Sequence, residues 1–365
     1  LLMMGGGRIG SNLSRMGGGG VCFENGGGLA LYGGSIADNT AGDSFGRVNG
    51  ILSSASLGGG VYFKTSGTVS IKGGSIFGNT AGHGGGLYIS GDNSTLQLLS
   101  GSITGNSAIM SEGGSGGGAY LLGTSSVFIS GGEISNNTVK SSNSYGVGLR
   151  LDKYSTVEMR GGEIKNNNTN YVKSSGGGIA FYGGGALALS GGKITNNMTT
   201  QHGGGVVFVE EGALYLTGGE ISNNKILWND NIGNGGGIAF LKGGTMTMAD
   251  GCTISGNKGA KQGGGLYMGG AAGTVTMTGG TISGNATVTD GHNGYGGAVN
   301  VDGVFKMYGG EIIGNTADYS GGGVFVDGGH FYMYGGEISG NTAYYLGGGV
   351  SIYRNGNCTV GKDAR

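Results

Sequence analysis

The chain has 365 residues, a net charge of −1 and charged side chains at only 11% of its positions. It therefore offers no basic stripe to neutralise phosphates, which argues against nucleic-acid binding, and it has no apolar run of about 18 residues that would span a membrane. Glycine makes up 95 residues and proline none, yet 36% of the chain is hydrophobic and glycine has no three-residue period, which excludes collagen and argues against plain disorder.

The first residues already belong to a repeat. Leu1–Met4 is predicted to be the second strand of a rung and the segment around Ile9 its third strand. Ile9 and Asn12 begin a series of twelve Ile-x-x-Asn phrases, most of them 26 to 33 residues apart. A fixed period in this range is typical of solenoid proteins.

The repeat from Gly58 to Asn79 shows the predicted elements most clearly. A triple glycine leads into Val61–Phe63, a short turn leads to Val69–Ile71, and a double glycine leads to Ser75–Ile76. Each segment is too short for a helix and alternates apolar with unrestricted residues, which predicts half-buried β-strands. We therefore expect three strands per rung, each with one buried and one free face.

The corner before the repeated asparagine is predicted to be a sharp turn. The preceding residue is Gly, Asn or Asp in eleven of the twelve copies, and Ser11 is the exception; these types tolerate the left-handed backbone region. Stacked rungs then align the asparagines in a column whose amides bond to one another along the axis. This structural ladder comprises Asn39, Asn79, Asn106, Asn137, Asn167, Asn197, Asn224, Asn257, Asn285, Asn315 and Asn341.

These elements predict an all-β fold, a parallel β-helix of about twelve three-strand rungs that forms one continuous domain over residues 1–365. Rungs of such a fold lie ~4.8 Å apart. The chain begins and stops at nearly the same phase of the rung, with no capping element in its sequence. We therefore expect either a segment cut from a longer solenoid or a subunit that associates head to tail through uncapped ends.

The repeated asparagine turn resembles the asparagine ladder of right-handed, single-stranded parallel β-helix proteins of the pectate-lyase-like class. The phrase Gly296-Gly297-Ala298-Val299 is similar to the Gly-Gly-Ala-Ile repeat of polymorphic outer-membrane proteins and related bacterial surface adhesins, although Ile-x-x-Asn replaces their Phe-x-x-Asn. The resemblance implies a right-handed β-helix that is secreted or displayed on the cell surface, and it implies no particular substrate.

Aromatic residues supply the candidate ligand-binding positions. Tyr62, Tyr88 and Tyr120 are predicted to align outward on the first strands of successive rungs, and Tyr308 and Tyr334 to align beside Tyr332 on the second strands. Such columns suit stacking on sugar rings or apolar partners, but they also suit packing of like on like within a sheet. Trp228 lies in a corner loop, at residues 225–234, and is a further candidate.

Charged residues do not assemble a catalytic pattern. Glu163, Lys193 and Glu220 are predicted to share one outward column; we weighed a cation site or a carboxylate pair for sugar chemistry and favour a solvated, charge-compensated face. His83, His202 and His292 lie in corner loops with no associated nucleophile. We therefore predict no catalytic residue, no metal site, no cofactor and no enzyme activity.

The leading functional hypothesis is a non-catalytic extracellular or cell-surface β-helix that acts as an adhesin, stalk or filament subunit. The alternatives are a polysaccharide lyase or hydrolase and a glycan-binding module on the same fold. Expected partners are a host or neighbouring-cell surface, including its glycans. Several ladder asparagines, such as Asn167, lie in glycosylation sequons, and because a glycan could not be packed inward we expect a bacterial producer.

Overall fold

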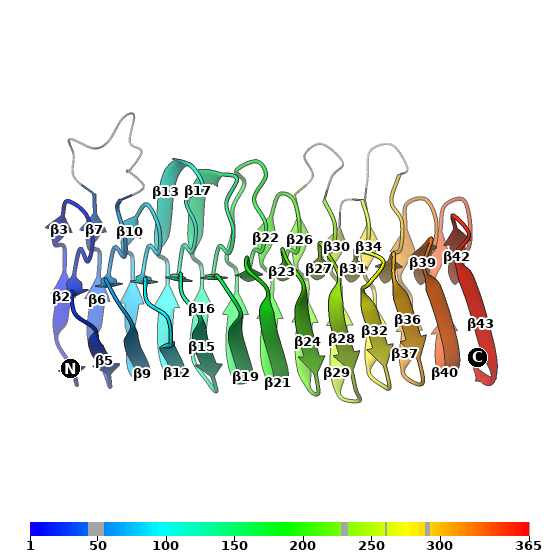
Figure 1. The fold of residues 1–365 in the computed structure, drawn as a ribbon, viewed down its shortest axis with the longest axis horizontal. Helices are drawn as coiled ribbons and strands as arrows, with labels where there is room; N and C mark the ends of the chain where they lie inside the picture. The colour runs from blue at the N-terminus through cyan, green and yellow to red at the C-terminus, as the bar shows by residue number, and fades with distance from the viewer. Residues whose placement is uncertain (43–54, 228–232, 260, 289–292, 365) are drawn as a thin grey trace. The chain divides into compact units, whose positions relative to one another are not determined.

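The computed structural model describes residues 1–42, 55–227, 233–259, 261–288 and 293–364, and the regular elements in these ranges are all β-strands. The strands form two compact units, Leu1–Gly183 and Gly184–Arg365. Within each unit they stack in chain order and pair in parallel (Figure 1). The units together hold about 11 turns of a β-solenoid. The predicted all-β, parallel architecture is confirmed.

The first strand of each rung has three or four residues and follows the glycine-rich corner. In unit 1, Leu1–Gly183, these are β4 (Val21–Phe23), β8 (Val61–Phe63), β11 (Leu87–Ile89), β14 (Ala119–Leu121), β18 (Leu149–Leu151) and β20 (Ile179–Phe181). In unit 2, Gly184–Arg365, they are β23 (Val206–Phe208), β27 (Ile238–Phe240), β31 (Leu266–Met268), β35 (Val299–Val301), β39 (Val324–Asp327) and β42 (Val350–Tyr353).

The second and third strands share one sheet and run together in several rungs. In unit 1 they are β1 (Leu2–Met4), β2 (Arg8–Gly10), β5 (Gly27–Leu31), β6 (Ser35–Ala37), β9 (Gly67–Phe77), β12 (Ser94–Thr104), β15 (Ser125–Ile129), β16 (Glu133–Ser135) and β19 (Ser155–Lys165). In unit 2 they are β21 (Gly185–Thr195), β24 (Gly212–Leu216), β25 (Gly219–Ser222), β28 (Gly244–Met248), β29 (Cys252–Ser255), β32 (Thr274–Met277), β33 (Thr281–Ser283), β36 (Val304–Met307), β37 (Glu311–Ile313), β40 (His330–Ser339) and β43 (Asn357–Ala364).

A fourth, short strand follows the repeated asparagine, and the sequence did not predict it. In unit 1 these strands are β3 (Leu13–Ser14), β7 (Thr40–Ala41), β10 (Thr80–Ala81), β13 (Ser107–Glu112) and β17 (Thr138–Ser142). In unit 2 they are β22 (Met198–Thr199), β26 (Lys225–Ile226), β30 (Lys258–Gly259), β34 (Ala286–Thr287), β38 (Thr316–Ala317) and β41 (Thr342–Ala343). They form because the ladder fixes the chain direction: the N–H of Thr80, for example, donates to Asn39 O at 2.9 Å.

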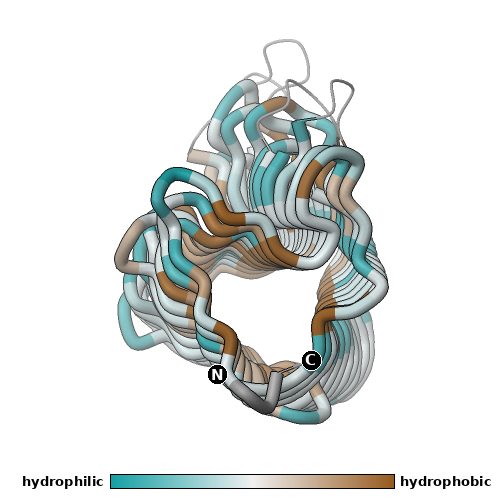
Figure 2. The backbone as a smooth tube through the Cα atoms, turned by 90° about the vertical axis from the view of Figure 1, so that its right-hand side faces the viewer, coloured by the Kyte–Doolittle hydropathy of each residue, from teal (hydrophilic) through white to brown (hydrophobic). Residues whose placement is uncertain are grey.

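The register places like residues on top of one another. Ile76 pairs with Ile36 on one side and Ile103 on the other, and all three are fully buried. Phe23 and Phe63 stack with ring centroids 4.2 Å apart and planes within 5°. Figure 2 shows hydrophobic residues recurring at the same places on successive rungs. The core of each unit is therefore a set of apolar columns parallel to the direction of stacking.

Two corners depend on residues that tolerate unusual backbone positions. The twelve residues that precede a repeated asparagine, Ser11 included, have φ between 54° and 65°, as the left-handed turn requires. In the triple-glycine corner, a Cβ on Gly59 would lie 2.4 Å from Gly85 O, so neighbouring backbones approach too closely for a side chain. The predicted reason for the glycine content is confirmed at both corners.

Candidate functional site

The asparagine ladder uses its polar groups internally. The backbone N–H and the Nδ2 of Asn79 both donate to Asn106 Oδ1, at 3.0 and 2.9 Å, and its Nδ2 also donates to Ile36 O at 3.0 Å. Its own Oδ1 accepts from the N–H and Nδ2 of Asn39. From Asn39 to Asn315 the ladder asparagines are at most 1% exposed. These amides hold rungs together and offer nothing to a ligand.

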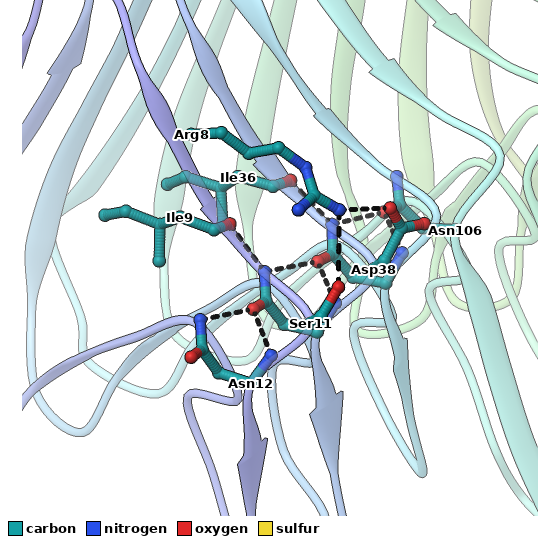
Figure 3. A network of polar contacts seen from close by, with 9 residues as sticks. Arg8, Ile9, Ser11, Asn12, Ile36, Asp38 and Asn106 are labelled. Carbon is teal, nitrogen blue, oxygen red and sulfur yellow. Dashed lines mark hydrogen bonds and ion pairs between the residues drawn. The ribbon is translucent and has the colours of Figure 1, made fainter.

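The first rung continues this ladder at its edge (Figure 3). Asn12 Nδ2 donates to Asn39 Oδ1 at 2.9 Å. Beside it, Arg8 of the first rung forms an ion pair with Asp38 of the next rung, with Arg8 Nη2 2.6 Å from Asp38 Oδ2. Both Arg8 and Asp38 are about half exposed, so this ion pair is solvated and worth little stability.

The glutamate column is compensated by lysines. Lys165 Nζ lies 2.9 Å from Glu133 and 2.5 Å from Glu163 in unit 1, and Lys193 Nζ lies 3.0 Å from Glu220 in unit 2. The hydrogen bond from Lys165 holds the pKa of Glu133 below its usual range, and those from Ser222 and Lys193 do the same for Glu220. Ionised, paired carboxylates of this kind stabilise a charged face and are poorly suited to donate a proton.

The predicted exposure of the first-strand tyrosines is wrong. Tyr62, Tyr88 and Tyr120 do align on β8, β11 and β14, but Tyr88 and Tyr120 are only 5% exposed and Tyr62 is half-buried. The cause is the segment before each triple glycine, which forms its own column of bridges beside the first strands and carries His83. The His83 ring lies 5.7 Å from that of Tyr120, so the tyrosine column is covered.

Arg150 is the centre of this covered cluster. Its guanidinium lies over the rings of Tyr120 and Tyr182 at 4.6 and 4.5 Å, a cation–π geometry. Its Nε lies 2.9 Å from Asp152 Oδ1, and the Tyr120 hydroxyl donates to Asp152 Oδ2 at 2.8 Å. Burial raises the pKa of Tyr88 to about 12 and, with the nearby Arg150, lowers the pKa of His83 to about 4. The cluster is thus an internally neutralised polar core.

Unit 2 carries a related cluster on its own first strands. Tyr267 Oη donates to Asp302 Oδ2 at 3.3 Å, and Asn300 is registered between Tyr267 and Phe325. Asn300 is fully buried and Asp302 partly so. Burial and the neighbouring carboxylate of Asp327 raise the pKa of Asp302. A groove of about 380 Å³ adjoins this region and is lined in part by Asp327 and Arg354.

The aligned second-strand tyrosines are exposed to solvent. Tyr308 and Tyr334 are 50% and 43% exposed, and their rings stack with centroids 4.9 Å apart and planes within 19°. Tyr332 lies in the same strand as Tyr334, with its ring parallel within 4° at 6.1 Å. Of the predicted binding residues in the described chain, Tyr308 and Tyr334 are the exposed ones.

The remaining candidates do not meet at one place. Trp228 and His292 lie outside the described residues. His202 is largely buried and its Nδ1 accepts from the N–H of Asn234 at 3.4 Å. Cys22, Cys252 and Cys358 are free thiols. Among the described residues, no group of three His, Cys, Asp or Glu side chains could hold a metal ion, and no helix is long and apolar enough to cross a membrane.

Sequence reasoning missed the importance of Arg150, Asp152, Asn300 and Asp302. Arg150 was visible only as one more unrestricted middle residue of a first strand. A usable signal was present in the sequence. The middle position of the first strand is a tyrosine on one rung and Arg150 or Asn300 on the next, and an aspartate follows two residues after Arg150 or Asn300. Recognising it requires knowing that the outer face of the first strands is covered, and the period-two alternation does not show that.

Comparison with known proteins bears on the fold. A family model described as a right handed beta helix region matches residues 51–219. Searches of curated proteins and of solved structures found no match. The family model and the parallel stacked strands lead to the same assignment, and the chain is a right-handed parallel β-helix repeat protein.

Proposed function

We propose that this protein is an extracellular, surface-displayed β-helix adhesin that binds polysaccharide through the tyrosine stack of unit 2. The stack consists of Tyr308, Tyr332 and Tyr334. The observation that carries the proposal is the exposed, near-parallel packing of Tyr308 on Tyr334 across neighbouring rungs.

Tyrosine suits this role for physical reasons. Each ring offers a large, rigid apolar face together with a hydroxyl, and ordering it costs little conformational entropy. Stacking in successive rungs fixes the rings before a ligand arrives, so the binding surface is preorganised. The CH faces of sugar rings can pack on such rings while their hydroxyls bond to the tyrosine Oη atoms.

The acidic side chains support binding rather than cleavage. A general acid for glycoside hydrolysis needs a raised pKa, whereas ion pairing and hydrogen bonds lower the pKa of Glu133 and Glu220. Asp302 has a raised pKa, but it lies at the end of the first strand β35 and accepts a hydrogen bond from Tyr267. It therefore belongs to a different face from the tyrosine stack.

The test is a glycan-array screen, followed by affinity measurement of the best ligand. We expect the double substitution Tyr308→Ala and Tyr334→Ala to weaken binding about tenfold or more, which corresponds to roughly 1.4 kcal/mol. Tyr215→Ala is the matched control, because Tyr215 is 46% exposed on β24 of the same unit. Equal affinity of the double variant and the control would rule out the stack as the binding site.

A further inference from the structure

The first strands of the two units carry a related motif. In unit 1, Tyr120 registers with Arg150, and Asp152 follows two residues later. In unit 2, Tyr267 registers with Asn300, and Asp302 follows two residues later. In both, the tyrosine hydroxyl donates to the aspartate Oδ2, at 2.8 and 3.3 Å. The two clusters share the tyrosine and the aspartate and differ at two places: Asn300 stands where unit 1 has Arg150, and Asp327 stands where unit 1 has Tyr182.

This exchange alters the charge balance. In unit 1 the Arg150 guanidinium lies 2.9 Å from Asp152 and neutralises it. In unit 2 a neutral amide stands at that position. Unit 2 also has a second carboxylate next to the first: Val301 and Val326 pair in register, and the residues that follow them are Asp302 and Asp327. Arg354 Nε lies 3.4 Å from Asp327 Oδ1, but its side chain is 69% exposed and screened by solvent. The two carboxylates therefore share one exposed cation, which leaves net negative charge in a partly buried place.

The polar atoms that face this place lack partners. Asn300 is 0% exposed, yet neither its Oδ1 nor its Nδ2 has a hydrogen-bond partner among the described residues. The buried Oδ1 of Asp302 also has no hydrogen-bond partner there, and the Oδ1 of Asp327 has none besides its ion pair with Arg354. A buried polar atom without a partner costs about 1–3 kcal/mol. Two such oxygens, on Asn300 and Asp302, lie beside the Asp327 carboxylate and point to a positively charged ligand that these groups share.

We propose that Asn300, Asp302 and Asp327 form a calcium-binding site that takes the electrostatic role of Arg150. Carboxylate and amide oxygens are the ligands of hard cations, and Ca²⁺ accepts irregular sets of six to eight oxygens completed by water. Mg²⁺ demands a near-ideal octahedron, which three side chains from neighbouring rungs do not provide. Asp327 also lines the groove of about 380 Å³, so this ligand can be reached from solvent.

The small number of protein ligands gives the site a modest affinity for Ca²⁺. Two carboxylates and one amide give fewer ligands than a dedicated cage, so we expect a dissociation constant on the order of 10⁻⁴ to 10⁻³ M. The site holds two acidic residues and one amide. This is compatible with the finding that no group of three or more His, Cys, Asp or Glu side chains in the described chain could hold a metal ion.

The experiment uses the full chain with Ca²⁺ and with Tb³⁺ as a luminescent probe. Tyr267 bonds to Asp302, so Tb³⁺ at the site should show luminescence sensitised by tyrosine, and Ca²⁺ should displace it. The decisive variant is Asn300→Arg, which rebuilds the arrangement of unit 1. We expect it to abolish the sensitised luminescence and to make the unfolding temperature independent of Ca²⁺, whereas Ca²⁺ raises that of the wild type. Asp302→Asn with Asp327→Asn should also abolish the signal.

Asp152→Asn is the matched control, since it alters the equivalent aspartate of unit 1, and it should leave the Tb³⁺ signal of unit 2 unchanged. Circular dichroism checks that each variant is folded. If the double variant does not fold, Asn300→Arg alone tests the proposal. Absence of a calcium effect in the wild type would overturn the proposal. Persistence of the luminescence in folded Asn300→Arg would also overturn it, because the ion would then be bound adventitiously elsewhere.

Discussion

At the scale of single residues, the side chains of the ladder asparagines form hydrogen bonds between rungs in the way that main-chain groups do. Each amide oxygen accepts two hydrogen bonds from the preceding asparagine, and each Nδ2 also donates to a main-chain carbonyl of the preceding rung, as Asn79 does with Ile36. Such a group differs from a binding residue in one measurable respect. Its removal should lower stability and leave affinity alone.

Asn167→Ala tests this distinction. Asn167 accepts from the N–H and Nδ2 of Asn137, at 3.1 and 2.9 Å, and donates to Ile134 O. Alanine leaves these buried groups without a partner, so we expect a loss of about 1–3 kcal/mol in the free energy of unfolding. Urea denaturation measures it, with the exposed Asn170→Ala as control. An unchanged midpoint, or a loss of polysaccharide affinity in folded protein, would contradict the structural role.

Two buried histidines predict a loss of stability in acid. Burial lowers the pKa of both His83 and His202 from 6.5 to about 4, with Arg150 contributing at His83. The unfolded chain therefore binds more protons than the folded one between pH 6.5 and 4. Stability is fully present above pH 6.5 and falls as the pH drops through that window, by about 2 kcal/mol for each histidine between pH 7 and pH 5.

The measurement is the urea midpoint at pH 7 and pH 5 for the wild type and for His83→Gln with His202→Gln. We expect the double variant to lose much of the difference between the two pH values, since glutamine does not titrate. His330→Gln is the control, because His330 lies at the start of β40 and is not part of either buried site. A pH dependence identical in all three proteins would assign the acid sensitivity to carboxylates instead.

At the scale of elements, several first strands, such as β11, β14 and β20, are buried on both faces, whereas the second strands are fully buried on only one. The sequence pattern is the same for both, an apolar–free–apolar triplet, so alternation predicts each inner face but cannot tell which outer face is covered. The covering comes from bridges such as Leu57 with His83 and Tyr145 with Ser175. These depend on how corner segments of different length fold back, which is a tertiary property.

The Arg150–Asp152 pair should be the most sensitive polar contact of the first-strand sheet. Their side chains are only 11% and 14% exposed, so Arg150→Met leaves a carboxylate largely buried without its cation. We expect a loss of about 3 kcal/mol, as for other buried pairs broken on one side. Asp152→Asn added to Arg150→Met should recover part of it, because the uncompensated charge is removed.

Thermal and urea unfolding of the single and double variants give the coupling energy directly. The exposed pair Arg160–Glu158 is the control, with side chains 62% and 45% exposed, and Arg160→Met should change stability little. A double variant of Arg150 and Asp152 that is less stable than the single one would show that Asp152 matters for its hydrogen bond from Tyr120 more than for its charge.

At the scale of the whole molecule, the repeat explains how much could be predicted. Strict recurrence of Ile and Asn fixes the register, the inner columns and the left-handed corner, because each rung meets its neighbours in the same way. The candidate sites depend instead on residues that break the repeat, such as Arg150, Asn300 and Tyr308, whose environment is set by neighbouring rungs. Periodicity therefore predicts the fold far better than the site.

The same reasoning predicts that a whole rung can be removed in register. Val299 and Val324 occupy equivalent places on β35 and β39, so deletion of residues 299–323 joins Ala298 to Val324 and preserves every column. Stability of a solenoid is a sum over rungs and their interfaces, so we expect a folded protein with the same β-rich circular dichroism and a smaller denaturant m-value, in line with the smaller surface exposed on unfolding.

Deletion of residues 299–324, one residue more, is the matched control. It places Phe325 where Val299 was, so the alternation of the strand is reversed and Asp327 turns toward the core. Burying a carboxylate among apolar columns costs several kcal/mol, and we expect this variant to be markedly less stable or unfolded. Similar unfolding midpoints for the two deletions would mean that the turns absorb a one-residue slip, and that register is not what the repeated sequence enforces.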